Sequence, residues 1–285
     1  MTERPRYRIT RAAYDVITVF GSLNAEAVPG QVITAVLGDR GWTESNVRNQ
    51  LTRLVERDLL SREQSGRYSV FTMTPQLLRN FEVLRSSAPR PVFDGSFRAL
   101  IHSVPERSRT LRDRLVYVAR LQGFHALRPG VLIGTEDTVD EVLQGIGPLD
   151  DDSWLIATRI VPASSREATR MAEIAFDLRR VRADIAGLGT RLACLQDAEP
   201  LPPQARYYDL HFDMAQKLLD VPRVPAGLIV GTLPDEQLGA MMGALNTVYW
   251  KRYWPHIRRV VAAQPSAALV RYLPDPAPTS LAEGP

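Results

Sequence analysis

The sequence has little cysteine and few histidines, and both scarcities exclude classes of protein. Cys194 is the only cysteine among 285 residues, which excludes an internal disulfide and a cysteine-based zinc site. Because it lies beside two leucines in a helical pattern, we expect Cys194 to be a buried apolar residue rather than a redox sensor. The chain has four histidines, and none of them is spaced from another as metal ligands are: His102, His125, His211 and His256.

Long apolar runs and catalytic motifs are also missing. No run is long enough to cross a membrane, and the arginine-rich residues 4–11 are not followed by a signal-peptide core. The chain has no Gly-x-Ser-x-Gly elbow and no phosphate-binding loop. We therefore expect a soluble cytoplasmic protein that is not an enzyme and holds no cofactor or metal.

Residues 43–56 predict an amphipathic helix. Val47, Leu51, Leu54 and Val55 recur with a period of 3.6 residues, so they form one apolar stripe. Thr43 is a suitable N-cap, because its hydroxyl can accept a hydrogen bond from a free amide of the first turn.

The opposite face of this helix is rich in short polar residues and arginine. Arginine pairs with guanine and asparagine with adenine in the major groove. A solvent-exposed face is the alternative, but such faces usually carry more Glu and Lys. The predicted DNA contacts on this helix are Ser45, Arg48, Asn49, Thr52 and Arg53.

The flanking segments complete a winged helix-turn-helix pattern. Residues 29–39 predict a preceding helix, and residues 59–63 and 68–73 predict two strands around a Gln-Ser-Gly-Arg turn. Arg62 and Arg67 flank this turn, where a wing meets DNA phosphates. The sequence therefore predicts a DNA-binding module over residues 1–88.

The charge distribution agrees with this module. The first 80 residues contain 11 arginines and eight acidic residues, whereas the other 205 contain 24 basic and 24 acidic residues. The whole net charge of +3 therefore lies in the module that would meet phosphates. Arg4, Arg6, Arg8 and Arg11 suggest an N-terminal arm that reaches a neighbouring groove, with a disordered tail as the alternative.

The rest of the chain predicts an α+β protein with two further domains. A Pro- and Ser-rich linker precedes residues 96–163, which alternate as β-α-β-β-α-β, the order of a ferredoxin-like fold that often pairs between subunits. Residues 164–273 have helical spacing, including a helix over 168–188. Residues 274–285 have the composition of a disordered tail.

The chain resembles the PaaX family of bacterial transcriptional repressors over nearly its whole length. The likeness rests on Trp42–Leu54, on residues 105–115 and 123–131 of a Cas2-like domain, and on the region around Phe176. The chain departs from the family where Phe176 and Leu233 replace tryptophans. The resemblance implies a homodimer on an inverted-repeat operator of double-stranded DNA, released by an acyl- or aryl-CoA thioester.

An effector site and two other functions stay open at this point. Aromatic and basic residues gather at Tyr249, Trp250, Arg252 and Trp254, as a CoA-thioester site would need, although a packed helix explains them as well. An architectural DNA-binding protein without an effector is one alternative. A metal-dependent nuclease is another, but residues 102–105 lack the required carboxylate and residues 150–152 suit a solvated turn.

Overall fold

The computed structural model describes residues 10–78, 90 and 92–273. They form two compact units. The first combines the N-terminal segment up to residue 86 with residues 191–216 and the segment from residue 242, and the second combines residues 87–190 with 217–241. No helix in the described ranges is both long and apolar enough to cross a membrane. Arg4, Arg6, Arg8 and the predicted tail lie outside these ranges.

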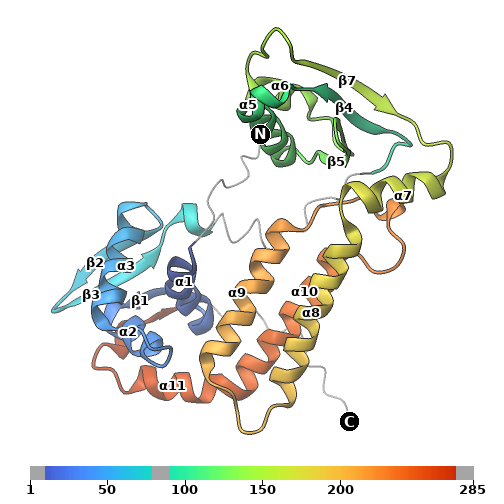
Figure 1. The fold of residues 1–285 in the computed structure, drawn as a ribbon. Helices are drawn as coiled ribbons and strands as arrows, with labels where there is room; N and C mark the ends of the chain where they lie inside the picture. The colour runs from blue at the N-terminus through green and yellow to red at the C-terminus, as the bar shows by residue number, and fades with distance from the viewer. Residues whose placement is uncertain (1–9, 79–89, 91, 274–285) are drawn as a thin grey trace. The chain divides into compact units, whose positions relative to one another are not determined.

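The N-terminal part of the first unit is a winged helix-turn-helix, as predicted (Figure 1). Apolar side chains of its three helices meet in one core, where Val36, Leu37 and Leu54 are fully buried. Its elements are α1 (Arg11–Leu23), β1 (Ala25–Pro29), α2 (Gly30–Gly38), α3 (Glu44–Glu56), β2 (Leu60–Ser65) and β3 (Tyr68–Met73).

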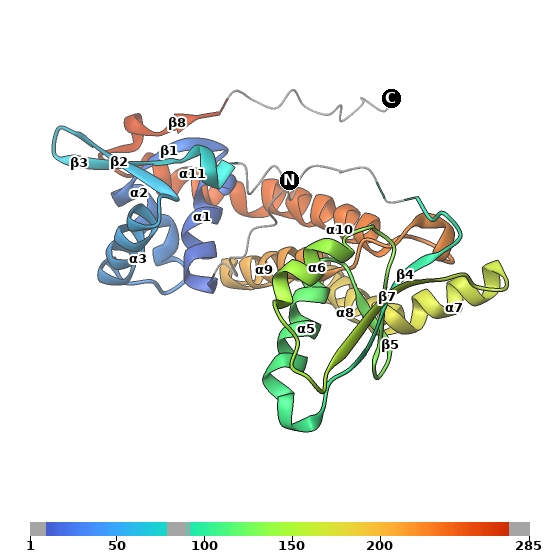
Figure 2. The ribbon, with the colours of Figure 1, turned by 90° about the horizontal axis from the view of Figure 1, so that it is seen from above.

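Two strands of the winged-helix sheet were not expected from the sequence. β1 pairs with β3 in the antiparallel sense, with Val28 opposite Phe71. On its other side β1 pairs with β8 (Arg271–Tyr272), so the strand order is β2-β3-β1-β8. Figure 2 shows β8 beside β1. The C-terminal segment therefore completes a sheet that begins in the N-terminal module.

The C-terminal segment also packs on the helices of this module. A π-helical turn, Tyr249–Tyr253, leads into α11 (Trp254–Ala262), which lies against α2. His256 Nε2 lies 2.6 Å from a carboxylate oxygen of Asp39, just after α2 ends. The winged helix therefore shares its packing with residues more than 200 positions away in the sequence.

The second unit contains the predicted ferredoxin-like fold. Its four strands form an antiparallel sheet of order β5-β6-β4-β7. Two helices cover one face, where Leu100, Leu115 and Val142 share a core. The elements are β4 (Phe97–Ser103), α5 (Arg109–Leu121), β5 (His125–Arg128), β6 (Val131–Gly134), α6 (Val139–Ile146) and β7 (Trp154–Ile160).

Four longer helices follow the ferredoxin-like segment. They are α7 (Ser165–Ala175), α8 (Leu178–Asp197), α9 (Gln204–Asp220) and α10 (Pro234–Val248). The single helix expected over 168–188 is divided, because Asp177 adopts a left-handed conformation with φ of 46°. These helices contribute residues to both compact units. These two units do not coincide with the domains expected from the sequence, whose boundaries were at residues 96, 164 and 273. Those domain boundaries stay a prediction.

Candidate DNA-binding surface

The start and end of α3 are set by local interactions that the sequence encodes. Thr43 Oγ1 accepts a hydrogen bond from Asn46 N at 3.3 Å, so the predicted N-cap is confirmed. Glu44 lies in the first turn, where a negative charge is favoured by the helix dipole. After Glu56, Asp58 adopts a positive φ of 55°, which ends the helix and directs the chain into β2.

The apolar stripe of α3 faces the core and leaves the predicted DNA contacts exposed. Val47, Leu51 and Leu54 are buried, whereas Val55 is only partly buried. The five predicted contact residues are all exposed on the helix, and they are Ser45, Arg48, Asn49, Thr52 and Arg53. Within the described part of the chain, the helix therefore presents one exposed polar face.

The residues on this face differ in how they are already engaged. Arg48 Nη2 lies 2.6 Å from Glu44 Oε1, and both side chains are about three-quarters exposed, at 73% and 72%. Thr52 Oγ1 donates to the carbonyl of Arg48 at 3.0 Å. Asn49 and Arg53 form no side-chain hydrogen bond or ion pair within the described chain. Among the described residues, these two polar side chains therefore have no partner to lose on contact with another molecule.

The hairpin of β2 and β3 has the form of a wing. Ser65 pairs with Tyr68, so Gly66 and Arg67 form the turn, and Gly66 adopts a φ of 58° that glycine tolerates. Arg67 lies over the Tyr68 ring at 5.0 Å from its centroid and remains exposed. Arg62 Nε donates to Ser69 Oγ at 3.1 Å. Both predicted wing arginines therefore lie at the surface.

Arg11 differs from its predicted place on an N-terminal arm. It is the first residue of α1, and its Nε lies 3.2 Å from Asp15 Oδ1. It also forms an ion pair with Asp209 of α9. Arg11 is therefore held by two carboxylates, because it is one turn before Asp15 on the same helix face.

An open depression beside α3 was not found by sequence reasoning. It is bordered by residues of α1, of the turn between α2 and α3, and of α3 itself. These residues are Ala12, Arg40, Gly41, Trp42, Asn46, Asn49, Gln50 and Arg53. Asn49 and Arg53 thus connect the depression to the predicted DNA-contacting face. No pattern in the sequence indicates it, since residues from three elements meet only in the fold.

A buried tyrosine cluster lies behind this surface. Tyr207 and Tyr208 of α9 contact Tyr249 of the π-helical turn, with ring centroids 5.0 Å and 6.4 Å apart. Burial raises the pKa of Tyr14, Tyr207 and Tyr249 well above the usual tyrosine value. These hydroxyls therefore stay neutral and act as hydrogen-bonding groups.

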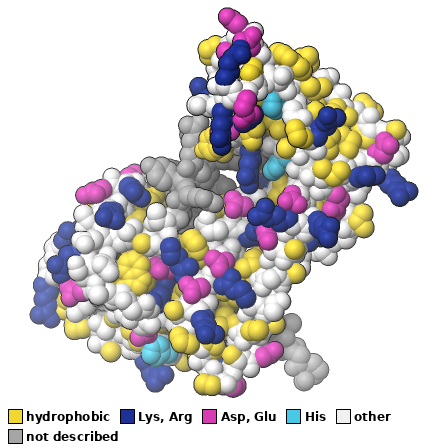
Figure 3. Space-filling view, in the orientation of Figure 1, with side chains coloured by type: hydrophobic (Ala, Val, Ile, Leu, Met, Phe, Trp, Pro, Cys, Tyr) yellow, Lys and Arg dark blue, Asp and Glu magenta, His cyan; other side chains and the backbone are white. Residues whose placement is uncertain are grey.

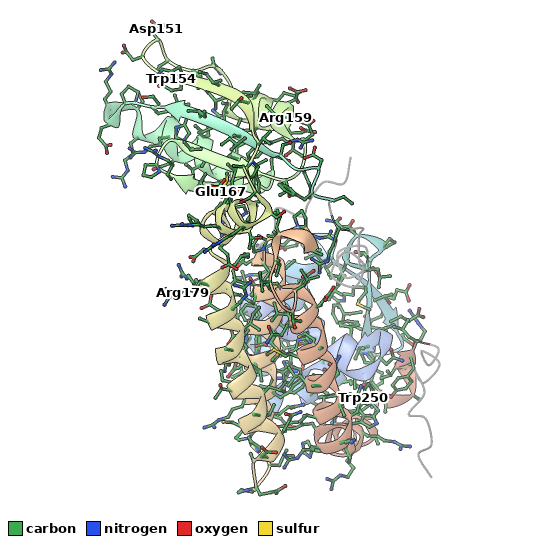
Figure 4. The ribbon with its side chains drawn as sticks, turned by 90° about the vertical axis from the view of Figure 1, so that its right-hand side faces the viewer. Asp151, Trp154, Arg159, Glu167, Arg179 and Trp250 are labelled. Atoms are coloured by element: carbon green, nitrogen blue, oxygen red, sulfur yellow. The ribbon has the colours of Figure 1, made fainter. Side chains whose placement is uncertain are left out.

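The structure separates the four predicted effector residues into two groups. Tyr249 is 2% exposed, and its hydroxyl donates to the carbonyl of Ser22 at 3.2 Å. Arg252 donates to the carbonyls of Leu195 and Gln196 in the last turn of α8 and to that of Ala198, just after the helix ends. Trp250, which is labelled in Figure 4, lies on the π-helical turn. Its side chain is 44% exposed, and its ring centroid lies 4.9 Å from that of Trp254. Trp250 also packs on the Tyr249 ring, with centroids 5.6 Å apart, but it keeps the most exposed ring surface of the three aromatic residues.

The cysteine and the aspartates that the sequence raised as a redox or metal site lie at the surface. Cys194 is exposed, so the expectation of a buried residue was wrong: its neighbouring leucines occupy the buried side of α8. Asp150 and Asp151 are exposed in the turn before β7, and Asp152 forms an ion pair with Arg107. The described residues contain no group of three His, Cys, Asp or Glu side chains that could hold a metal ion.

Comparison with known proteins supports the DNA-binding interpretation. Residues 9–116 match the model of the penicillinase repressor family, which covers the winged helix and the start of the ferredoxin-like segment. A solved structure, the uncharacterized protein Rv0674 from Mycobacterium tuberculosis, aligns over 80% of this chain and 90% of its own with a TM-score of 0.53. At 20% identity this second likeness shows the fold alone. No curated protein matches the chain. The family match supports a DNA-binding transcriptional repressor.

Proposed function

We propose that this protein is a transcriptional repressor that recognises a specific double-stranded DNA sequence with α3. The observation that carries the proposal is the exposed polar face of this helix, on which Asn49 and Arg53 have no partner within the described chain. Asparagine and arginine are the side chains that form bidentate contacts with adenine and guanine in the major groove. These two residues would therefore distinguish one base sequence from another.

The wing and the flank of α3 would supply contacts to phosphates. Figure 3 shows basic side chains gathered over the edge of the first unit that carries the β2–β3 hairpin. Arg62 and Arg67 are exposed there. Phosphate contacts fix the register of a protein on DNA but contain no sequence information. We therefore assign α3 to specificity and the wing to general affinity.

A binding-site selection from random duplexes, followed by gel-shift titration, tests this proposal. The expected result is one enriched sequence that binds wild type far more tightly than scrambled DNA at the same salt concentration. Asn49→Ala should reduce this preference, whereas Gln76→Ala, an exposed change beyond the wing, should not. Equal binding of all duplexes would contradict sequence-specific recognition.

We further propose that the repressor binds an inverted repeat as a homodimer. Its support is the resemblance to PaaX repressors and the edge strand β7, which has β4 as its only partner among the described strands. Trp154, which is labelled in Figure 4, is the first residue of this strand. Trp154 and Ile156 are 48% and 54% exposed. A two-fold pairing would place half-site centres about one or two helical turns apart, roughly 10–21 bp. Light scattering and a footprint of two half-sites test it.

Release by an acyl- or aryl-CoA thioester is likewise a proposal that rests on the PaaX resemblance. The tryptophan pair Trp250 and Trp254 is the part of the predicted site that could stack on an aromatic or adenine ring. Tyr249 and Arg252 would join only if their present contacts with Ser22 and the end of α8 opened. Calorimetry with CoA thioesters tests it, and Trp250→Ala is expected to weaken binding. Unchanged binding by that variant would reject this site.

A further inference from the structure

Helix α9 and the π-helical turn contact the winged helix through partly buried hydrogen bonds. Tyr14 of α1 and His211 of α9 meet with the tyrosine oxygen 2.5 Å from Nδ1. Ser22, also on α1, forms a 2.7 Å hydrogen bond with the hydroxyl of Tyr208 on α9. Its carbonyl accepts from Tyr249 of the π-helical turn. All these residues belong to the same compact unit as α3.

Arg40 connects this network to the start of α3. It occupies the turn between α2 and α3, three residues before the N-cap Thr43. Its side chain is 3% exposed, and its guanidinium carbon lies 2.9 Å from the centroid of the Tyr208 ring. Its Nη1 lies 3.5 Å from the carboxylate of Asp15 on α1. Arg40 thus touches α1 and α9 from the segment that immediately precedes α3.

A buried arginine at position 40 is not the side chain that would stabilise the fold most. Its Nε and Nη2 atoms are buried and have no hydrogen-bond partner among the described residues. Burying donors without partners costs free energy, and replacing a buried ion pair with apolar residues is often neutral or stabilising. Asp15 would keep Arg11 as a partner if Arg40 were replaced. A costly residue next to α3 suggests a functional role.

We propose that Arg40 is a positioning residue through which helix α9 sets the orientation of α3 for operator recognition. The inference rests on the proposed function, because it assigns a cause to the specificity of α3. Arg40 borders the same depression as Asn49 and Arg53, so a shift of the turn moves both base-contacting residues. Base contacts need accurate placement, whereas phosphate attraction tolerates small shifts. Loss of Arg40 should therefore reduce specific binding and leave non-specific binding nearly intact.

Arg40→Met tests the proposal in the full-length protein, because methionine fills similar space without charge or buried donors. We expect an unchanged or higher melting temperature, operator affinity about 5-fold or more weaker, and scrambled-DNA affinity within about twofold of wild type. Without DNA, amide hydrogen exchange should become faster over residues 44–56. Arg40→Lys, which keeps the charge but loses the planar stack, should rescue only part of the operator affinity.

Two variants of Tyr208 keep the test informative if Arg40→Met folds poorly. Tyr208→Phe keeps the ring under the guanidinium and should preserve most of the operator preference. Tyr208→Leu removes the ring and should behave like Arg40→Met. The proposal is overturned if Arg40→Met binds operator like wild type. It is also overturned if stability, operator binding and scrambled-DNA binding fall together, which indicates a structural role. A wild type without sequence preference contradicts the proposed function instead, and the exchange measurement still tests the link between Arg40 and α3.

Discussion

Replacing Arg53 with alanine should weaken operator binding while leaving the fold unchanged. Arg53 is exposed on α3 and has no hydrogen-bond or ion-pair partner among the described residues, so its removal breaks no polar contact of that part of the fold. Alanine has a high helix propensity, which offsets the small loss of a cation in the last turn. If the lost contact is a bidentate one to guanine, the cost is about 1–3 kcal/mol, or ~5- to 150-fold in Kd.

Arg48 provides the matched comparison on the same helix. It is exposed like Arg53, but it already pairs with Glu44 at 2.6 Å. That pair must be exchanged for a DNA contact, so Arg48→Ala should cost less than Arg53→Ala by roughly 0.3–0.5 kcal/mol, the usual value of an exposed i,i+4 pair. Fluorescence anisotropy with operator and scrambled duplexes at two salt concentrations measures both. Equal operator affinity of Arg53→Ala and wild type would refute the assignment of this helix face.

The other predictions concern the wing, the core and pH. Arg67→Ala should weaken binding to operator and to scrambled DNA by the same factor. The salt dependence of the affinity should fall by about one phosphate contact, which fluorescence anisotropy at several salt concentrations measures. Leu54→Ala, at a fully buried position, should lower the free energy of unfolding by about 2–5 kcal/mol in urea titrations. Burial and the nearby Arg40 lower the pKa of His211 to about 4, so its contribution to stability is complete above pH 6.5 and is lost as pH falls towards 4. Melting temperatures measured between pH 7 and pH 4 should show this loss of stability, and the loss should be smaller in His211→Gln. An equal loss in that variant would show that other groups cause it.

The DNA-binding module could be predicted from the sequence because its signals are local. The N-cap Thr43, the apolar stripe of α3 and the Gly66 turn each depend on residues within one helix or hairpin. The alternation of elements over residues 96–163 likewise fixed the order of the ferredoxin-like fold. Such patterns are set by helix and strand periodicity, which a single sequence contains.

The parts that the sequence did not predict depend on contacts between distant residues. β8 has only two residues, and it is a strand because it pairs with the edge of β1, about 245 positions earlier in the sequence. The pairing of Arg40 with Tyr208 joins residues 168 positions apart, and no local pattern indicates it. Arg252 looked like a ligand-binding cation in the sequence, yet in the fold it caps the carbonyl end of α8. Local composition cannot distinguish these two roles of an arginine.

The most direct test of sequence-specific recognition by α3 is the ratio of affinities for selected operator and scrambled DNA, measured at one physiological salt concentration. For wild type we expect a ratio of about 10³ or more, the usual range for specific DNA-binding proteins. The double variant Asn49→Ala/Arg53→Ala should bring the ratio close to one while its affinity for scrambled DNA stays near that of wild type. A wild-type ratio near one, or a ratio unaffected by the double variant, would contradict recognition through this helix.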